Sequence, residues 1–213
     1  MTALLVLAKE PRPGHSKTRL TPPLRPEEAA EVAEAALVTT LGAARAARAD
    51  RRILVLDGAP GAWLPPGFDV IRQRGRGQAE RLARAFEDVG APALLIGMDS
   101  PQVTPAMLDR AMELLMQPGT GAVLGPAEDG GWWAIGLRRA DERVFRSVPM
   151  SRPDTGERQL ERLRRLGLHT RLLPPLRDVD TFADAVAVAR TGRGTPVART
   201  IERLRDAAHA VTG

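Results

Sequence analysis

Two short apolar runs, residues 3–8 and 93–97, constrain the fold more than any other feature of the sequence. A strand that is apolar along its whole length has to be covered on both faces, which is typical of a parallel sheet between two layers of helices. Sheets of that kind bind ligands beyond the carboxyl ends of their strands. The residues that follow these two runs are therefore the first candidates for a functional site.

The rest of the chain alternates between patterns typical of strands and of helices. We expect further strands at 52–57, 68–73, 122–124 and 132–137, and helices at 26–48, 78–89, 105–116, 181–191 and 196–210. Pro26 and two glutamates suit the start of the first helix, and Thr104 suits a helix cap. Short connections between alternating elements predict an α/β fold with an open, mostly parallel sheet. We expect one domain, residues 1–213, to which the helix at about 196–210 is appended.

Composition argues against several classes of function. The chain has no cysteine, which excludes a disulfide framework, a thiolate zinc site and a cysteine nucleophile. It has no uninterrupted stretch of about 18 apolar residues, so we expect a cytoplasmic protein with no membrane partner. The net charge is +5, but few aromatic residues are available to stack on bases, so we expect no nucleic-acid partner. The arginine-rich stretches at 158–165 and 199–205 contain interleaved glutamates, which favours solvated helix faces.

A loop rich in glycine and proline follows the first apolar run. The two lysines of the chain, Lys9 and Lys17, lie on either side of this loop. Arginine replaces lysine everywhere else, so these two positions suggest a need for a compact ammonium group. Together with Arg19 and the backbone amides around Gly14, they predict a phosphate-binding loop. The alternative is a solvated basic loop. The segment is not a P-loop, because Ser16 stands where that motif requires glycine.

Three acids are candidates for holding a divalent metal ion. Asp99 follows the second apolar run, where a carboxylate needs a cation or several donors to remain ionised. Asp178 and Asp180 lie two apart, so an extended backbone would direct both side chains to one side. Their oxygen ligands suit Mg²⁺ or Mn²⁺. The structural alternatives are that Asp99 or Ser100 caps the following turn and that Thr181 forms a capping box with Asp184.

A second glycine-rich segment precedes the strand at 132–137. Asp129 is a candidate for orienting or deprotonating an acceptor, and Gly130 and Gly131 would permit close approach of the backbone to a ligand. By the period of two residues in a strand, Trp133 belongs to the core, whereas Trp132 shares its face with small residues and could form a wall of an acceptor pocket. Ordinary packing of Trp132 is the alternative.

The loop after the strand at 68–73 resembles a dinucleotide-binding motif only in part. Glu80 stands where the third glycine of that motif is required. We therefore interpret the segment as a loop near a nucleotide, with Gln73 and Gly75 as candidate contacts, and not as an NAD site.

Four motifs in order along the chain resemble the DUF2064 family of bacterial proteins, often labelled glycosyltransferase family A or radical-SAM/selenodomain-associated transferase 1. They are Lys9-x-Pro-x-x-Gly14-x-x-Lys17-Thr18-Arg19-Leu20, Gly97-Met98-Asp99-Ser100-Pro101, Gly125-Pro126-Ala127-Glu128-Asp129-Gly130-Gly131 and Asp178-Val179-Asp180-Thr181. The resemblance covers most of residues 4–185. Phe182 departs from the proline that is usual after the last motif, and Trp132-Trp133 stand where members often have tyrosine.

The resemblance implies a GT-A fold, with three α/β/α layers and a mostly parallel mixed sheet. It implies that a divalent metal ion assists transfer of a sugar from a nucleotide sugar to a small-molecule acceptor. Lys17 and Arg19 would bind phosphates, and Asp99 would bind the metal with Asp178 or Asp180. The alternative is nucleotidyl transfer from a nucleoside triphosphate to a phosphorylated acceptor, because two motifs are also similar to phospholactate and molybdenum cofactor guanylyltransferases. A basic nucleic-acid-binding protein and a non-catalytic scaffold are the alternatives from other classes.

Overall fold

The computed structural model describes residues 1–90, 92–177, 181–192 and 194–212. Within these residues, seven strands form one sheet in the order β3-β2-β1-β4-β6-β5-β7. The strands are β1 (Ala3–Lys9), β2 (Arg51–Asp57), β3 (Asp69–Arg72), β4 (Ala93–Gly97), β5 (Ala122–Pro126), β6 (Trp132–Leu137) and β7 (Thr170–Leu172). β6 pairs antiparallel with β4 and β5, and the remaining pairs are parallel. The predicted mostly parallel mixed sheet is confirmed.

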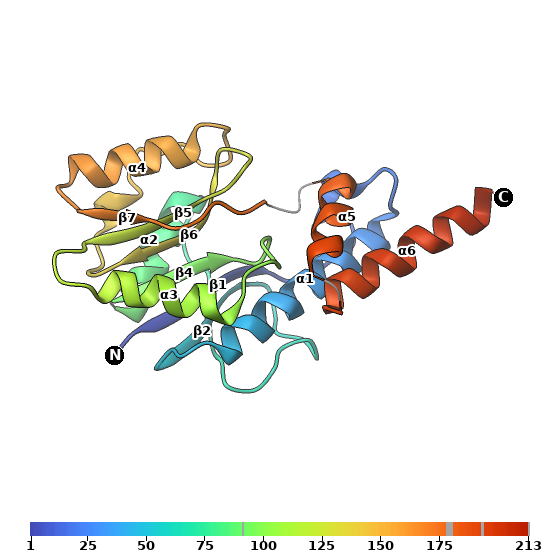
Figure 1. The fold of residues 1–213 in the computed structure, drawn as a ribbon, viewed down its shortest axis with the longest axis horizontal. Coiled ribbons are helices and arrows are strands. Elements are labelled where there is room, and N and C mark those ends of the chain that lie inside the picture. Colours follow the sequence, from blue (N-terminus) through green and yellow to red (C-terminus); the bar gives the residue numbers. More distant parts are fainter. Residues whose placement is uncertain (91, 178–180, 193, 213) are drawn as a thin grey trace.

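Helices cover both faces of this sheet and produce the three expected layers (Figure 1). One face packs against α1 (Pro26–Ala46) and α3 (Pro105–Met116), and the other against α2 (Gln78–Val89), η2 (Glu142–Val144) and α4 (Thr155–Arg165). The central strand β1 shows why both layers are needed. Leu4 and Val6 belong to the core on the α1 face, and Leu5 belongs to the core on the α2 face. Because successive side chains of a strand point to opposite faces, the uninterrupted apolar run fills both cores.

The last two helices form a third apolar cluster beside the sheet. α5 (Phe182–Thr191) and α6 (Pro196–Thr212) pack against the N-terminal half of α1, and Leu20 of η1 (Thr18–Leu20) lies fully buried among them. Figure 1 shows these helices projecting away from the sheet. The cluster anchors the short helix that directly follows Lys17.

Local signals located most of the element starts. Thr104 accepts a hydrogen bond from Met107 N at 3.3 Å, and Pro26 occupies the first turn of α1, as predicted. The prediction missed β7, whose three residues are too few for a period-two pattern. It also extended the first helix to Arg48, whereas the backbone turns extended at Ala47. None of the helices in the described part of the chain has the length and apolar character needed to cross a membrane.

Candidate functional site

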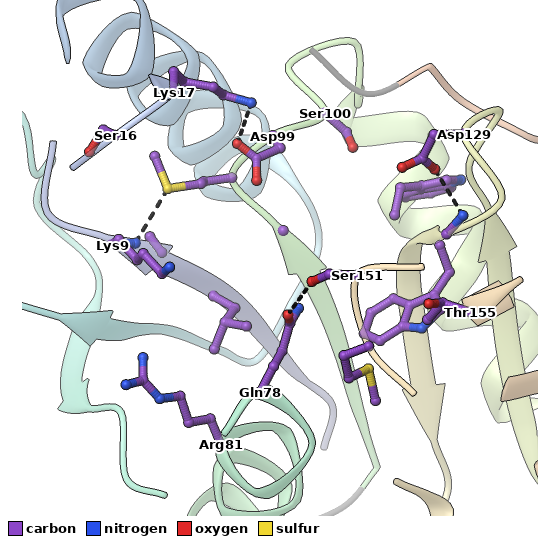
Figure 2. A pocket seen from close by; sticks show the side chains of 18 of the residues that line it. Lys9, Ser16, Lys17, Gln78, Arg81, Asp99, Ser100, Asp129, Ser151 and Thr155 are labelled. Carbon is purple, nitrogen blue, oxygen red and sulfur yellow. Dashed lines mark hydrogen bonds and ion pairs between the residues drawn. The ribbon is translucent and has the colours of Figure 1, made fainter. Parts of the chain in front are cut away.

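A cavity of about 810 Å³ opens at the carboxyl ends of β1 and β4. The chain proceeds from β1 outward to β2 and β3, whereas β4 lies on the other side of β1, so the cavity occupies the point where the strand order reverses. Open α/β sheets bind ligands at this kind of position. The rest of the wall comes from the loop at 15–19, the start of α2, the turn before β6 and the segment at 150–155 (Figure 2).

Lys17 and Asp99 meet at the rim of this cavity (Figure 2). Lys17 Nζ lies 2.6 Å from Asp99 Oδ1, and the lysine side chain is only 7% exposed whereas the aspartate side chain is 49% exposed. Lys17 has a left-handed backbone with φ of 51°, an uncommon conformation for a residue other than glycine, and it is the cap residue of η1. The sequence-based expectation that Asp99 requires a nearby cation is therefore met by Lys17. A second contact joins the ends of β1 and β4, since Lys9 N donates to Met98 Sδ at 3.3 Å.

Hydrogen bonds within the loop at 10–16 hold the backbone that leads to Lys17. Ser16 is buried, and its Oγ accepts from Arg12 N at 3.1 Å and donates to Glu10 O at 3.2 Å. The amides of His15 and Ser16 both donate to Arg12 O at 3.1 Å. Gly14 has φ of 73°, is exposed and is not among the residues that line the cavity. The amides of Arg12, His15 and Ser16 are thus engaged within the loop, and the loop residues that line the cavity are 15–19.

The loop is also tied to its neighbour by a carboxylate. Glu10 accepts hydrogen bonds from Arg12 and, at 2.8 Å, from Ala59 N. The hydrogen bond from Arg12, together with that from Ala59 N, lowers the pKa of Glu10. Gly58 has φ of 124°, and a Cβ there would lie 2.4 Å from the Glu10 carboxylate. The glycine therefore leaves space for this contact.

Gln73 lies in the cavity wall, but its amide is engaged by protein groups. Its Nε2 donates to Ala8 O at 2.7 Å and to Val55 O at 3.1 Å, which ties the ends of β1 and β2 together. Its Oε1 accepts from Arg81 at 3.2 Å, and Arg81 also pairs with Asp57 at 2.6 Å. Gln73 is thus placed to orient Arg81, a cavity residue that sequence reasoning missed because its partners are distant along the chain.

Gly75 was a further candidate contact, yet it is absent from the described lining of the cavity. Its φ is 130°, and a Cβ on it would lie 2.9 Å from Arg81 N. Glycine at this position is explained by the tight packing of the loop on the start of α2. The Glu80 carboxylate also holds this loop against α2, because it accepts a hydrogen bond from Arg76 N at 3.0 Å.

The turn before β6 carries Asp129 to the opposite wall of the cavity. Asp129 Oδ1 accepts from Gly131 N at 2.8 Å, which fixes the carboxylate (Figure 2). A Cβ on Gly130 would lie 1.8 Å from Pro153 O, and one on Gly156 would lie 2.4 Å from Gly131 O. The backbone of Gly130 and Gly131 thus packs closely against the segment leading into α4. The expected approach of this backbone to a ligand stays a prediction. Gly131 lines the cavity, whereas Gly130 is not among the described lining residues.

The two adjacent tryptophans have different environments. Trp133 is 2% exposed and donates from Nε1 to Pro174 O at 3.0 Å, so its predicted place in the core is confirmed. Trp132 is half-buried, lines the cavity and also packs against the core on the α2 face. Its Nε1 is buried and has no hydrogen-bond partner among the residues that the structure describes. Trp132 therefore takes part in ordinary packing, and its role as a wall of an acceptor pocket stays a prediction.

The segment at 149–155 completes the wall beside Trp132, and sequence reasoning gave no signal for it. Thr155 Oγ1 accepts from Arg152 N at 3.0 Å and donates to Pro149 O at 2.9 Å. Ser151 has φ of 58° and donates from Oγ to Gln78 Oε1 at 3.4 Å, a contact that bridges the two sides of the cavity (Figure 2). Strained backbone of this kind persists where surrounding contacts enforce it, often at ligand sites.

The structure describes only part of the predicted metal ligand set. Asp178 and Asp180 lie outside the described residues, and no group of three potential ligands is found within the part that is described. Asp99 fits a hard divalent cation, because it presents carboxylate oxygen at the cavity rim and is half exposed. The capping box of Thr181 and Asp184 is present, which confirms the structural role suggested for those two residues.

The sequence profile of the family described as "Uncharacterized protein conserved in bacteria (DUF2064)" matches residues 28–152. The chain belongs to the DUF2064 family. No curated protein matches this chain.

Several solved structures are similar to this DUF2064 protein. A candidate nucleotide-diphospho-sugar transferase from Desulfovibrio desulfuricans G20 is 27% identical, with a TM-score of 0.84 over 96% of this chain and 94% of that one. The protein Rv0371c from Mycobacterium tuberculosis in complex with manganese is 26% identical, with a TM-score of 0.50 over 88% and 96%. A nucleotidyl transferase from Methanothermobacter is 16% identical, with a TM-score of 0.55 over 88% and 95%, and shows likeness of fold. The DUF2064 chain thus has the fold of nucleotide-diphospho-sugar transferases, as the sequence motifs implied.

Proposed function

We propose that this protein is a divalent-metal-dependent transferase that moves a sugar from a nucleotide sugar to a small-molecule acceptor. The observation that carries the proposal is the Lys17–Asp99 pair, at 2.6 Å, on the rim of a cavity at the reversal point of the sheet. The likeness to the Desulfovibrio protein over 96% of the chain supports a nucleotide sugar as the donor.

The donor would bind on the β1 side of the cavity. Four cationic residues line this side: Lys9, Lys17, Arg19 and Arg81. Charge-assisted contacts from such groups stabilise a diphosphate, and they become stronger as negative charge develops on the leaving group. Gln73 would contribute indirectly by holding Arg81, whereas Gly14 and Gly75 would act through the backbone conformations of their loops.

Asp99 is the described residue placed to hold the metal ion, with Asp178 or Asp180 as proposed additional ligands. A bound Mg²⁺ or Mn²⁺ would supply positive charge to the leaving diphosphate. The manganese complex of the 26% identical protein supports the use of a divalent metal ion. The Lys17 ammonium lies 2.6 Å from the Asp99 carboxylate, so a metal ion bound by Asp99 would lie close to the proposed phosphate-binding lysine.

In the transfer step, a donor bound on one side of the cavity would react with an acceptor bound on the other. An acceptor hydroxyl oxygen forms a bond to the anomeric carbon of the sugar while the bond from that carbon to the diphosphate oxygen breaks. The nucleoside diphosphate leaves with the electron pair, and the hydroxyl proton passes to Asp129. The hydrogen bond from Gly131 N orients the Asp129 carboxylate for this role. Gly130, Gly131 and Trp132 would shape the adjoining acceptor pocket.

Nucleotidyl transfer is the second candidate, because the cluster of Lys9, Lys17 and Arg19 also suits the charge of a triphosphate. In that reaction an acceptor phosphate oxygen bonds to the α-phosphorus of a nucleoside triphosphate. The bond between the α-phosphorus and its bridging oxygen breaks, and pyrophosphate leaves with the electron pair.

The deciding experiment measures binding by calorimetry for nucleotide sugars and nucleoside triphosphates, each with Mg²⁺, Mn²⁺ or EDTA. We expect metal-dependent binding of one nucleotide sugar, and release of its nucleoside diphosphate when pooled small-molecule acceptors are added. Preference for a triphosphate, with release of pyrophosphate, would favour the second candidate. Absence of binding by every nucleotide would reject both.

A further inference from the structure

We propose that the acceptor carries an anionic group, a phosphate or a carboxylate, and that Arg152 recognises it. This inference rests on the proposed transferase function and concerns the side of the cavity that the donor phosphates do not need. No sequence motif pointed to Arg152. It enters the argument through the position of its segment in the tertiary structure.

The first observation is the distribution of charge around the cavity. The cations of the β1 side come from the loop at 9–19 and from α2. On the opposite wall, formed by the turn before β6 and the segment at 150–155, Arg152 is the one cation among the described lining residues. The same wall also contains the acid Asp129 and the apolar residues Trp132 and Met150. A guanidinium beside an apolar wall suits a small organic anion, because it donates two parallel hydrogen bonds to a phosphate or carboxylate.

The second observation is that the segment carrying Arg152 is firmly positioned. Arg152 N is held by Thr155 Oγ1, and Thr155 is only 5% exposed. Pro153 O contacts Gly130 so closely that no side chain could replace the glycine hydrogen, and Gly156 N donates to Gly130 O at 2.8 Å. The glycine turn that orients Asp129 therefore also fixes the backbone of Arg152. Recognition groups need this support, because an imprecisely held contact contributes little specificity.

The third observation concerns the guanidinium itself. Its nearest acid is Asp154, at 3.4 Å from Nε to Oδ1, and Asp154 Oδ1 makes no hydrogen bond within the described chain. Arg158 binds the other oxygen of Asp154 at 2.6 Å, and this hydrogen bond is the main reason that the pKa of Asp154 is lowered. Asp154 is thus neutralised chiefly by Arg158. The Arg152 side chain is 63% exposed and remains available to a ligand.

The test uses three probes of the same carbon skeleton: glycerol, glycerate and glycerol 3-phosphate. Saturation-transfer NMR measures their binding to the full-length protein, with and without the nucleotide that binds most tightly in the calorimetry proposed above. The variants are Arg152→Gln and the matched control Arg158→Gln. Both arginines are exposed partners of Asp154, but Arg158 is not among the described lining residues of the cavity.

We expect a signal from at least one anionic probe and none from glycerol. The Arg152→Gln variant should lose at least tenfold in affinity for that probe, whereas Arg158→Gln should retain it. Comparing glycerate with glycerol 3-phosphate shows whether the site requires a carboxylate or a phosphate. Equal binding of glycerol, absence of a signal from both anions, or an unchanged Arg152→Gln variant would each overturn the proposal.

Nucleotide affinity, measured on the same variants, separates this proposal from the function on which it rests. We expect Arg152→Gln to bind the nucleotide as the parent does. An equal loss of affinity for the nucleotide and for the probe would indicate that Arg152 contacts the donor, and it would overturn the assignment of Arg152 to the acceptor. Anion binding by a protein that binds no nucleotide would instead reject the transferase while leaving the anion site intact.

Discussion

The Lys17 ammonium and the Asp99 carboxylate lie 2.6 Å apart at the end of β4, and the lysine is buried whereas the aspartate is half exposed. Because the two side chains differ in burial, substitutions of Lys17 and of Asp99 should have different consequences. Neutralising Asp99 leaves a buried cation with less compensation, and it also removes an oxygen ligand from the cavity rim.

We predict that Asp99→Asn lowers the free energy of unfolding without ligand by about 1–2 kcal/mol, because the ion pair between the Lys17 ammonium and the Asp99 carboxylate is lost. The variant should still bind nucleotide in EDTA, since the competing negative charge beside Lys17 is gone, but Mn²⁺ should no longer strengthen that binding. Calorimetry with and without metal checks this result. Asp129→Asn is the control and should keep the metal dependence. An undiminished effect of Mn²⁺ in Asp99→Asn would remove Asp99 from the metal site.

Alanine substitutions of Gly130 and Gly14 distinguish the cost of steric conflict from the cost of backbone strain. Both have positive φ, 88° and 73°, but a Cβ would lie 1.8 Å from Pro153 O at Gly130 and would have no neighbour within 4 Å at Gly14. We predict that Gly14→Ala costs about 1 kcal/mol, whereas Gly130→Ala costs at least 3 kcal/mol because the segment at 150–156 must move. Urea denaturation measures both. Similar costs for the two variants would contradict the described fit of Gly130 against Pro153.

The adjacent tryptophans should respond differently to replacement by phenylalanine. Trp133→Phe removes a buried hydrogen bond to Pro174 O, so we expect it to cost about 2–3 kcal/mol of stability. Trp132→Phe removes an indole N–H that has no partner in the described structure, and its cost should stay below about 1 kcal/mol. Thermal and urea denaturation of both variants test the contrast. A larger loss for Trp132→Phe would show that its indole N–H has an acceptor in solution.

The lowered pKa of Asp141 predicts how the stability of the protein changes at acidic pH. A hydrogen bond from Arg143, the largest cause, lowers the pKa of Asp141 from its ordinary value of 3.8. A carboxyl whose pKa is lower in the folded state stabilises the protein above the unfolded pKa, and this contribution is lost as the pH falls through the folded pKa. We predict that Asp141→Asn loses less stability than the parent when the pH falls below 3.8.

Asparagine at this position can still accept from Arg143 N, which Asp141 Oδ1 does at 2.9 Å, so the variant isolates the charge. The measurement is urea denaturation from neutral pH to below 3.8. Arg143→Gln should flatten the curve to a similar degree, because it removes the same ion pair. Parallel curves for the parent and both variants would show that the pair does not contribute in solution.

Much of the fold and one half of the candidate site could be predicted from local patterns. Apolar runs identified the two central strands, and their ends correctly located Lys17 and Asp99 at one edge of the sheet. These signals are readable because periodicity and capping act over a few neighbouring residues. The proposed metal ligands Asp178 and Asp180 remain predictions from sequence, since they lie outside the described residues.

By itself, then, the sequence determined the layered α/β architecture, the family, the basic loop after β1 and the acid after β4. Only the tertiary structure decided that Gln73 and Asp57 engage Arg81, that Gly130 accommodates Pro153, and that Arg152 reaches the cavity. Each of these contacts joins segments that are separate along the chain, and neither partner carries a local pattern that specifies the other. Their pairing follows from how the helices and loops pack on the sheet, because close packing fixes which distant groups have room to meet.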